Sequence, residues 1–277
     1  MNGDGERDWL VVECDGLPYL LAKTVIYRSQ IEAQKQALKE AGIPATSSLK
    51  GPELKQELQR RGLDTRGRVE DLRCRLQHAV DKQLRSGEIA LPSKAKGEYD
   101  WVVLRSGGLH WEMKLLQCVV EVLWPMVYQA FAESQGYTTE RQQEWAKSCR
   151  DHHRAYDELS RFVDGTFQEL LFPYVRASTN PTPQGFFEWA KQFAGNKTYS
   201  LLLELTTRCA FGVFVFRHGV RHNKYSARLL GKRAVSPLLH ARHFPNYQLI
   251  DLFSEEDELS YPEDIRDFFT SFSSLSR

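Results

Sequence analysis

The sequence predicts a mainly α-helical protein with a small β component, an α+β fold. Two short apolar segments with β propensity, WLVVEC at residues 9–14 and WVVL at residues 101–104, are each followed by a glycine-containing turn and an apolar helical run. Elsewhere, apolar residues recur mostly at helical spacing. With 42% hydrophobic and 26% charged residues, the chain has the composition of a folded globular protein.

The cysteines and the N-terminal sequence indicate an intracellular protein. The five cysteines are scattered and form no C-x-x-C pair, which argues against a disulfide framework and against a zinc ribbon. The chain starts with the polar sequence MNGDGERD, which has no features of a secretion signal. No apolar run approaches membrane-spanning length, so we expect no membrane partner.

Three regions follow one another along the chain. Residues 1–44 are expected to form a strand and then a polar helix near residues 24–41. Residues 45–88 have the features of a separate module, and the polar sequence RSGEIALPSKAKGEYD after them is typical of a connecting loop. Residues 98–277 are expected to form a mostly helical body with an acidic C-terminal segment.

Within the body, helical periodicity covers four stretches separated by loop signals. One of these signals is the sequence STNPTPQ at residues 178–184, where the prolines predict a loop. The predicted helical stretches are residues 113–132, 141–176, 186–195 and 199–217. No internal repeat and no long heptad pattern is present.

The module at residues 45–88 contains two short amphipathic helical patterns. The first begins at Gly51-Pro52-Glu53, because proline suits the first helical position and an acidic residue favours the positive end of the helix dipole. Gly62 is placed to end this helix in a left-handed conformation. The second pattern follows a turn that contains Gly67.

The apolar residues of the two patterns can form a small common core. We expect this core to contain Leu49, Leu54, Leu58, Leu63, Val69, Leu72 and Leu76. The basic residues would then remain largely outside it, at Lys50, Lys55, Arg60, Arg61, Arg66, Arg68, Arg73 and Arg75.

This spacing resembles the SAP domain. The pattern L-(x4)-L-K-(x2)-L-(x3)-GL-(x3)-G-(x4)-L-(x3)-L runs from Leu49 to Leu76, and the resemblance covers about an eighth of the chain. It implies a helix, turn and helix module that binds duplex DNA, commonly AT-rich, in nuclear proteins. The chain departs from the family at Val69, where a lysine is usual two positions after the turn glycine.

Elementary electrostatics supports the same expectation. The N-terminus of the second helix offers free N–H groups and a positive dipole to a phosphate, next to Arg66 and Arg68. We expect backbone binding of low sequence specificity. The candidate DNA-binding residues are Lys50, Lys55, Arg60, Arg61, Arg66, Gly67, Arg68 and Arg73. The alternative is an ordinary helical hairpin with a solvated charged face.

A second basic stretch lies in the body. The net charge is only +1, but residues 205–250 contain eight lysines and arginines and no acidic residue, whereas residues 251–267 contain eight acidic residues. The candidate surface residues are Arg217, Arg221, Lys224, Arg228, Lys232 and Arg233. They could contact nucleic acid with the help of interleaved aromatic residues, or they could pair with the acidic block.

Asp15 and His110 each follow a predicted strand, a position where α/β folds place reactive side chains. Together with KSCRDHHRAYDE and FFEWAKQ, these segments make the body loosely similar to proteins encoded by animal transposable elements, some of which have an RNase H-like core. Such a core needs three acidic residues around two metal ions. Here only Asp15 lies in a suitable position, and Glu112 is a poor second.

The sequence therefore predicts a nuclear, transposon-derived DNA-binding protein, with no catalytic residues, no cofactor and no metal. The sequence Cys149-x-x-His152 offers two of the four ligands that zinc needs, and no second pair is visible. The alternatives are a remnant of a metal-dependent nuclease or transposase and a protein-interaction scaffold. The oligomeric state is not predicted.

Overall fold

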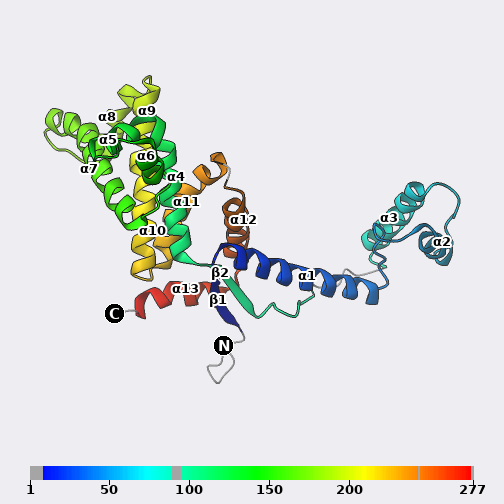
Figure 1. Cartoon of the computed structure of the whole chain (residues 1–277). Coiled ribbons are helices and arrows are strands. Elements are labelled where there is room, and N and C mark those ends of the chain that lie inside the picture. Colours follow the sequence, from blue (N-terminus) through cyan, green and yellow to red (C-terminus); the bar gives the residue numbers. More distant parts are fainter. Residues whose placement is uncertain (1–8, 89–94, 243, 276–277) are drawn as a thin grey trace. The chain divides into compact units, whose positions relative to one another are not determined.

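The computed structural model describes residues 9–88, 95–242 and 244–275, and it is mainly helical with one small two-stranded parallel sheet (Figure 1). The expected fold class, mainly α with a small β component, is therefore confirmed. The chain divides into two compact units, residues 1–12 with 21–104 and residues 13–20 with 105–277. The boundary passes through both strands and the first helix.

The first 106 residues contribute the sheet, a long helix and a helical hairpin. Their elements are β1 (Leu10–Cys14), α1 (Gly16–Glu40), α2 (Gly51–Arg60), α3 (Val69–Ser86) and β2 (Val102–Ser106). The helix α1 starts directly after β1, earlier than the expected range of residues 24–41. β2 extends beyond the expected WVVL segment.

The two strands pair in parallel, and a helix follows each of them. Leu10 donates its N–H to the carbonyl of Trp101 at 2.9 Å, and Gly107 donates to the carbonyl of Cys14 at 2.9 Å. Because the strands run in the same direction, the turn after β1 and the turn after β2 lie at the same edge of the sheet.

The connector after α3 is held along α1. Ala95 donates its N–H to the side chain of Gln34 at 2.9 Å, and Glu98 donates to the hydroxyl of Ser29 at 2.7 Å. The first part of the expected loop, residues 89–94, lies outside the described residues.

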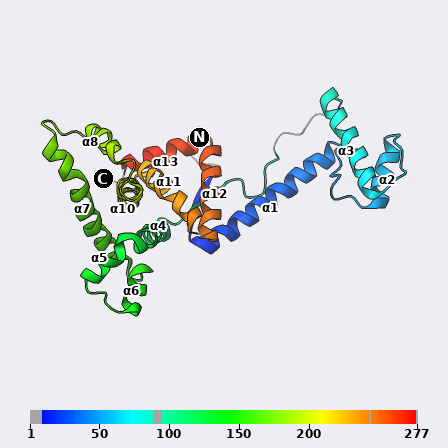
Figure 2. The same ribbon diagram turned by 90° about the horizontal axis from the view of Figure 1, so that it is seen from above.

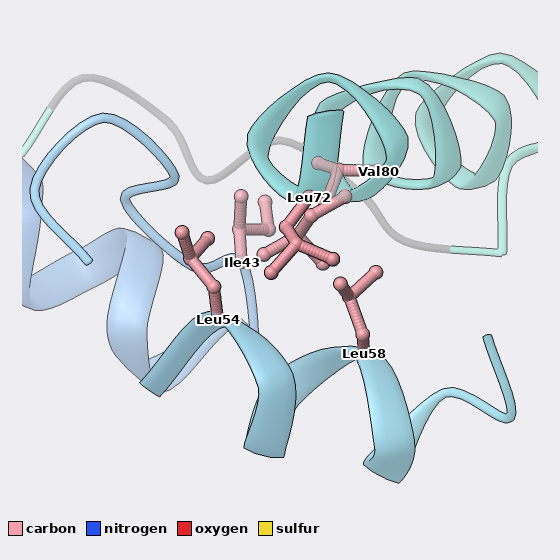
Figure 3. Close-up of a cluster of buried hydrophobic side chains, with 6 residues drawn as sticks. Ile43, Leu54, Leu58, Leu72 and Val80 are labelled. Carbon is pink, nitrogen blue, oxygen red and sulfur yellow. The ribbon is translucent and has the colours of Figure 1, made fainter. Parts of the chain in front are cut away.

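The hairpin of α2 and α3 has its own apolar core, which Figure 3 shows. Its buried residues are Ile43, Leu54, Leu58, Leu72, Leu76 and Val80. Leu49 and Leu63, which were expected in this core, are partly buried against it. Val69 was also expected there, but its side chain is 42% exposed. It is the first residue of α3, before the apolar stripe begins at Leu72.

Local sequence signals set the ends of α2. Pro52 lies in its first turn, and Lys50 donates its N–H to the carboxylate of Glu53 at 2.7 Å. Gly62 follows the helix with φ +68°, as expected for a left-handed end. Leu63 then donates its N–H back to the carbonyl of Leu58 at 2.8 Å.

The body is built from helices, two of them continued by short π-helical segments. These elements are α4 (Gly108–Leu123), η1 (Trp124–Tyr128), α5 (Gln129–Ser134), α6 (Glu140–Lys147), α7 (His152–Ala177), α8 (Pro183–Ala190), η2 (Lys191–Phe193), α9 (Lys197–Glu204), η3 (Leu205–Ala210), α10 (Phe211–Arg221), α11 (Tyr225–Ala241), α12 (Pro245–Ser260) and α13 (Glu263–Leu275). Figure 2 shows α5 and α6 near the beginning of α7 and α8 near its end.

The single helix expected at residues 141–176 is in fact two helices. Cys149 adopts a left-handed conformation with φ +51°, which interrupts the helical path after α6. Asp151 then caps α7, because its carboxylate accepts the N–H of Arg154 at 3.1 Å.

The centre of the body is formed by α4, α10 and α11, which pack against one another. Leu115, Val119, Val213 and Val235 are fully buried there. The helices α10 and α11 approach closely at Gly212 and Gly231. A β-carbon added at Gly231 would lie 2.5 Å from the carbonyl oxygen of Gly212.

Two helical stretches, Gly108–Ser134 and Lys197–Arg221, are long and apolar enough to cross a membrane by length and composition. The sequence expectation that no apolar segment approaches this length was wrong. Core helices of soluble proteins have the same properties, and here the two stretches contact each other through α4 and α10. An ion pair between Glu112 and Arg217 at 2.7 Å joins them.

Candidate nucleic-acid interface

The N-terminus of α3 presents two exposed arginines, Arg66 and Arg68. The intervening Gly67 has φ +122°, a conformation that L-residues rarely adopt, and a β-carbon there would lie 3.3 Å from that of Asp71. Because the first N–H groups of a helix have no acceptor within the helix, this end can donate to an oxyanion.

Arg75 holds the turn that carries these arginines. Its guanidinium donates to the carbonyl of Asp64 at 2.6 Å and to the carbonyl of Arg66 at 3.0 Å. Arg75 therefore fixes the turn and contributes little free charge. The sequence pattern does not show that Arg75 binds these two carbonyls, because the contact depends on the conformation of the turn.

Two lysines extend the exposed basic face on the α2 side of the hairpin. Lys50 and Lys55 are exposed. Within the described part of the chain, no carboxylate forms an ion pair with Lys50, Lys55, Arg66 or Arg68. These four residues are the free cations of the hairpin among the candidate DNA-binding residues.

Two further candidates are turned into the hairpin instead. The side chain of Arg61 is only 10% exposed, and it donates to Glu57 at 2.9 Å, to the carbonyl of Gly42 at 3.0 Å and to the side chain of Gln83. Arg73 is half-buried and donates to the carbonyl of Leu49 at 3.3 Å. Both were expected to lie largely outside the core, on the basic surface. Arg61 is instead almost buried and Arg73 half-buried, and each donates to groups of the protein itself.

Arg60 is intermediate between the free cations and the two arginines that are turned inward, because it is exposed but paired. Its side chain is 66% exposed and forms an ion pair with Glu57 at 3.2 Å. An exposed pair of this kind contributes little stability and leaves the guanidinium accessible.

Acidic residues moderate the charge at the start of α3. Glu70 and Asp71 lie in its first turn, and the carboxylate of Asp71 accepts the N–H of Arg68 at 3.1 Å. A phosphate bound here must therefore overcome the negative charge of two nearby carboxylates, which lowers the expected affinity.

The second basic stretch is largely engaged in ion pairs. Arg217 pairs with Glu112 at 2.7 Å, and Arg228 pairs with Glu13 at 3.4 Å. Toward the acidic block, Lys232 contacts Glu255 at 2.8 Å, and Arg233 contacts the same carboxylate at 2.8 Å. Only part of the stretch therefore pairs with the acidic block. Arg217 and Arg228 pair instead with carboxylates far away in the sequence.

The two remaining basic candidates stay accessible. Arg221 and Lys224 are exposed at the turn between α10 and α11, and no ion pair to either is present among residues 9–88, 95–242 and 244–275. They flank Asn223, which has φ +48°.

The structure brings Asp15 and His110 together at the edge of the sheet. Nδ1 of His110 lies 2.9 Å from a carboxylate oxygen of Asp15, and both side chains are about half exposed. Glu112, the other acidic candidate, is 1% exposed and paired with Arg217. In the described residues, no group of three or more His, Cys, Asp or Glu side chains is arranged to hold a metal ion.

Comparison with known proteins adds no relative. No family model, no curated protein and no solved structure matches this chain.

Proposed function

We propose that this protein binds duplex DNA through the SAP-like hairpin of α2 and α3. The binding is to the phosphate backbone, with low sequence specificity, and the protein acts in the nucleus. The observation that carries the proposal is the pair of exposed arginines, Arg66 and Arg68, at the open N-terminus of α3.

The packing of the hairpin supports this assignment. Its core is small and apolar, and Arg61, Arg73 and Arg75 are bound to groups of the hairpin and of the segment just before it. The unpaired cations are therefore held on a defined scaffold, which lowers the entropy lost when they meet a phosphate. The SAP resemblance describes the same arrangement.

A titration of the intact chain with duplex DNA at several salt concentrations tests the proposal. The variant Arg66→Glu with Arg68→Glu should lose most of its affinity at low salt. The neutral double variant, with glutamine at both positions, should reduce the slope of log K against log salt by about two, because each phosphate contact contributes about one.

The matched control lies on the same helix. Lys82 and Arg85 are exposed near the C-terminal end of α3, so Lys82→Glu with Arg85→Glu makes the same charge change away from the proposed contact. This control should keep most of the affinity. Equal losses in the two double variants would reject a site at the start of α3 and leave only a general charge effect.

A further inference from the structure

An open hollow of about 490 Å³ lies where the two strands of the sheet end. Glu13 and Asp15 line it from β1 and the turn after it, Gly108 from the start of α4, and Arg228 from α11. All of these residues belong to the same compact unit. In sheets of parallel strands, ligands bind beyond the carboxyl ends of the strands, which is where this hollow is found.

The charge balance of the hollow is unusual. Arg228 and Arg105 both contact one oxygen of Glu13, each at 3.4 Å. The two guanidinium side chains are only 13% and 16% exposed, so water screens them weakly. Glu13 is therefore shared by two largely buried cations, of which Arg105 also interacts with the carboxylate of Glu258.

The positive charge of Arg228 is only partly balanced, because Glu13 is shared with Arg105. Burial lowers the pKa of Arg228, and the positive charge of Arg105 lowers it further. Arg105 has an additional partner, because its guanidinium lies 4.4 Å from the ring centre of Phe269. Arg228 is thus the cation that an added anion would stabilise most.

Arg228 packs against the backbone at the start of α4, beside the hollow. A β-carbon added to Gly108 would lie 3.3 Å from a terminal nitrogen of Arg228, so the guanidinium lies directly against this glycine. The free N–H groups at the beginning of the helix are in the same region as the Arg228 fork. Asp15 is the opposing charge, and it is paired with His110 at 2.9 Å.

We propose that this hollow binds a tetrahedral oxyanion of the phosphate class, held mainly by Arg228. The proposal does not rest on the DNA-binding hairpin, because every residue that carries it lies outside the hairpin, in the compact unit of residues 13–20 and 105–277. A planar guanidinium fork can donate two parallel hydrogen bonds to phosphate oxygens. The ligand is either free phosphate or the terminal phosphate of a nucleic acid.

Calorimetric titration of the intact protein with sodium phosphate, at constant ionic strength maintained by sodium chloride, tests the site. The wild-type protein should show saturable binding of one phosphate. Arg228→Gln should weaken it at least about tenfold, the size of effect that loss of one charged hydrogen bond produces. Arg233→Gln makes the same charge change on the same helix and should leave phosphate binding unchanged.

Amide NMR spectra of the wild-type protein provide a readout that does not depend on how well a variant folds. Phosphate, but not chloride, should shift the signals of Gly107 and Gly108 in a saturable way. Absence of these shifts, or equal weakening by Arg228→Gln and Arg233→Gln, would overturn the proposal.

The two sources of phosphate are distinguished in the background of Arg66→Glu with Arg68→Glu, which removes the hairpin contact. Competition by a 5′-phosphorylated oligonucleotide, but not by its 5′-hydroxyl counterpart, identifies a nucleic-acid end as the ligand. If neither oligonucleotide competes with phosphate, the ligand is free phosphate. Because this background lacks the hairpin arginines, failure of DNA binding and failure of the phosphate site are measured separately.

Discussion

At the scale of single residues, Arg60 and Arg61 are adjacent in sequence but have different roles. Both contact Glu57, yet the side chain of Arg60 is 66% exposed whereas that of Arg61 is 10% exposed. Only Arg61 also reaches Gly42 and Gln83. The sequence assigns both to the basic surface because helical periodicity at the end of a short helix does not show which of two consecutive arginines turns inward.

This difference predicts different effects on stability. Arg61→Ala should lower the free energy of unfolding of the hairpin by about 1–3 kcal/mol, because it leaves half-buried acceptors without a donor. Arg60→Ala should change it by no more than about 0.5 kcal/mol, as is usual for surface positions. Denaturant unfolding followed by hydrogen exchange within residues 51–86 measures both. Similar values for the two variants would contradict the role given to Arg61.

Glu258 in α12 predicts a pH dependence of stability. Burial raises the pKa of Glu258 to about 7 from a reference of 4.5, although Arg105 opposes the shift. Between these values the folded protein binds more protons than the unfolded chain, so stability falls as the pH rises through this window. Glu258→Gln should therefore be more stable than the wild type at pH 8, and the difference should disappear near pH 4.

The measurement is the denaturant midpoint at both pH values. Glu256→Gln, on an exposed position of the same helix, is the matched control for the loss of one negative charge. A stability difference for Glu258→Gln that is the same at pH 4 and pH 8 would show that the glutamate does not act through its proton.

At the scale of elements, the limits of a helix can be predicted from the sequence when the residues that set them lie within one turn of its end. The limits of α2 depend on Pro52 and Gly62, which act within one turn, and both were predicted. The break before α7 depends on a left-handed Cys149, and a cysteine carries no sequence signal for that conformation. The exposed start of α3 at Val69 was also missed, because periodicity does not define which residue begins a stripe.

Because α10 and α11 are in close contact, we expect that a single methyl group added between them will strongly lower the stability of the protein. At Gly231, a β-carbon would lie 2.5 Å from the backbone nitrogen of Phe216 as well as from the carbonyl of Gly212. Gly231→Ala must separate two core helices and should destabilise the protein by about 1–3 kcal/mol or more.

Gly165 in α7 is the control, because a β-carbon there meets nothing within 4 Å. Gly165→Ala should stabilise the protein by about 0.5–1 kcal/mol, since alanine loses less entropy in a helix. Thermal unfolding of both variants tests the pair. A neutral Gly231→Ala would show that α10 and α11 do not pack as closely as described.

At the scale of the whole molecule, 37 basic and 36 acidic residues nearly balance, and several of them form ion pairs between segments that are distant in sequence. Arg217 pairs with Glu112, and Arg242 pairs with Glu121 at 3.2 Å. Sequence analysis detected the basic and acidic blocks but could not assign these partners, because more than a hundred residues separate each pair. The candidate hairpin site was easier to predict, because its residues lie within one short segment.

The acidic C-terminal segment is therefore expected to be part of the body and not a removable mask. Ile250, Ile265 and Phe269 are buried, and Asp251 lies in the interior 3.4 Å from the buried Lys232. Deleting residues 251–277 should expose this apolar surface and lower the thermal unfolding temperature strongly, without tighter DNA binding.

A point substitution tests whether the acidic segment covers a nucleic-acid surface, without the loss of folding that a deletion would cause. Glu255→Gln removes the carboxylate that pairs with Lys232 and Arg233 while it keeps the helix α12. Because Lys232 is buried, only Arg233 gains accessible charge, so the affinity for duplex DNA should change far less than in the Arg66→Glu, Arg68→Glu variant. A large gain in affinity for Glu255→Gln, at unchanged thermal stability, would establish that the acidic segment covers a nucleic-acid surface.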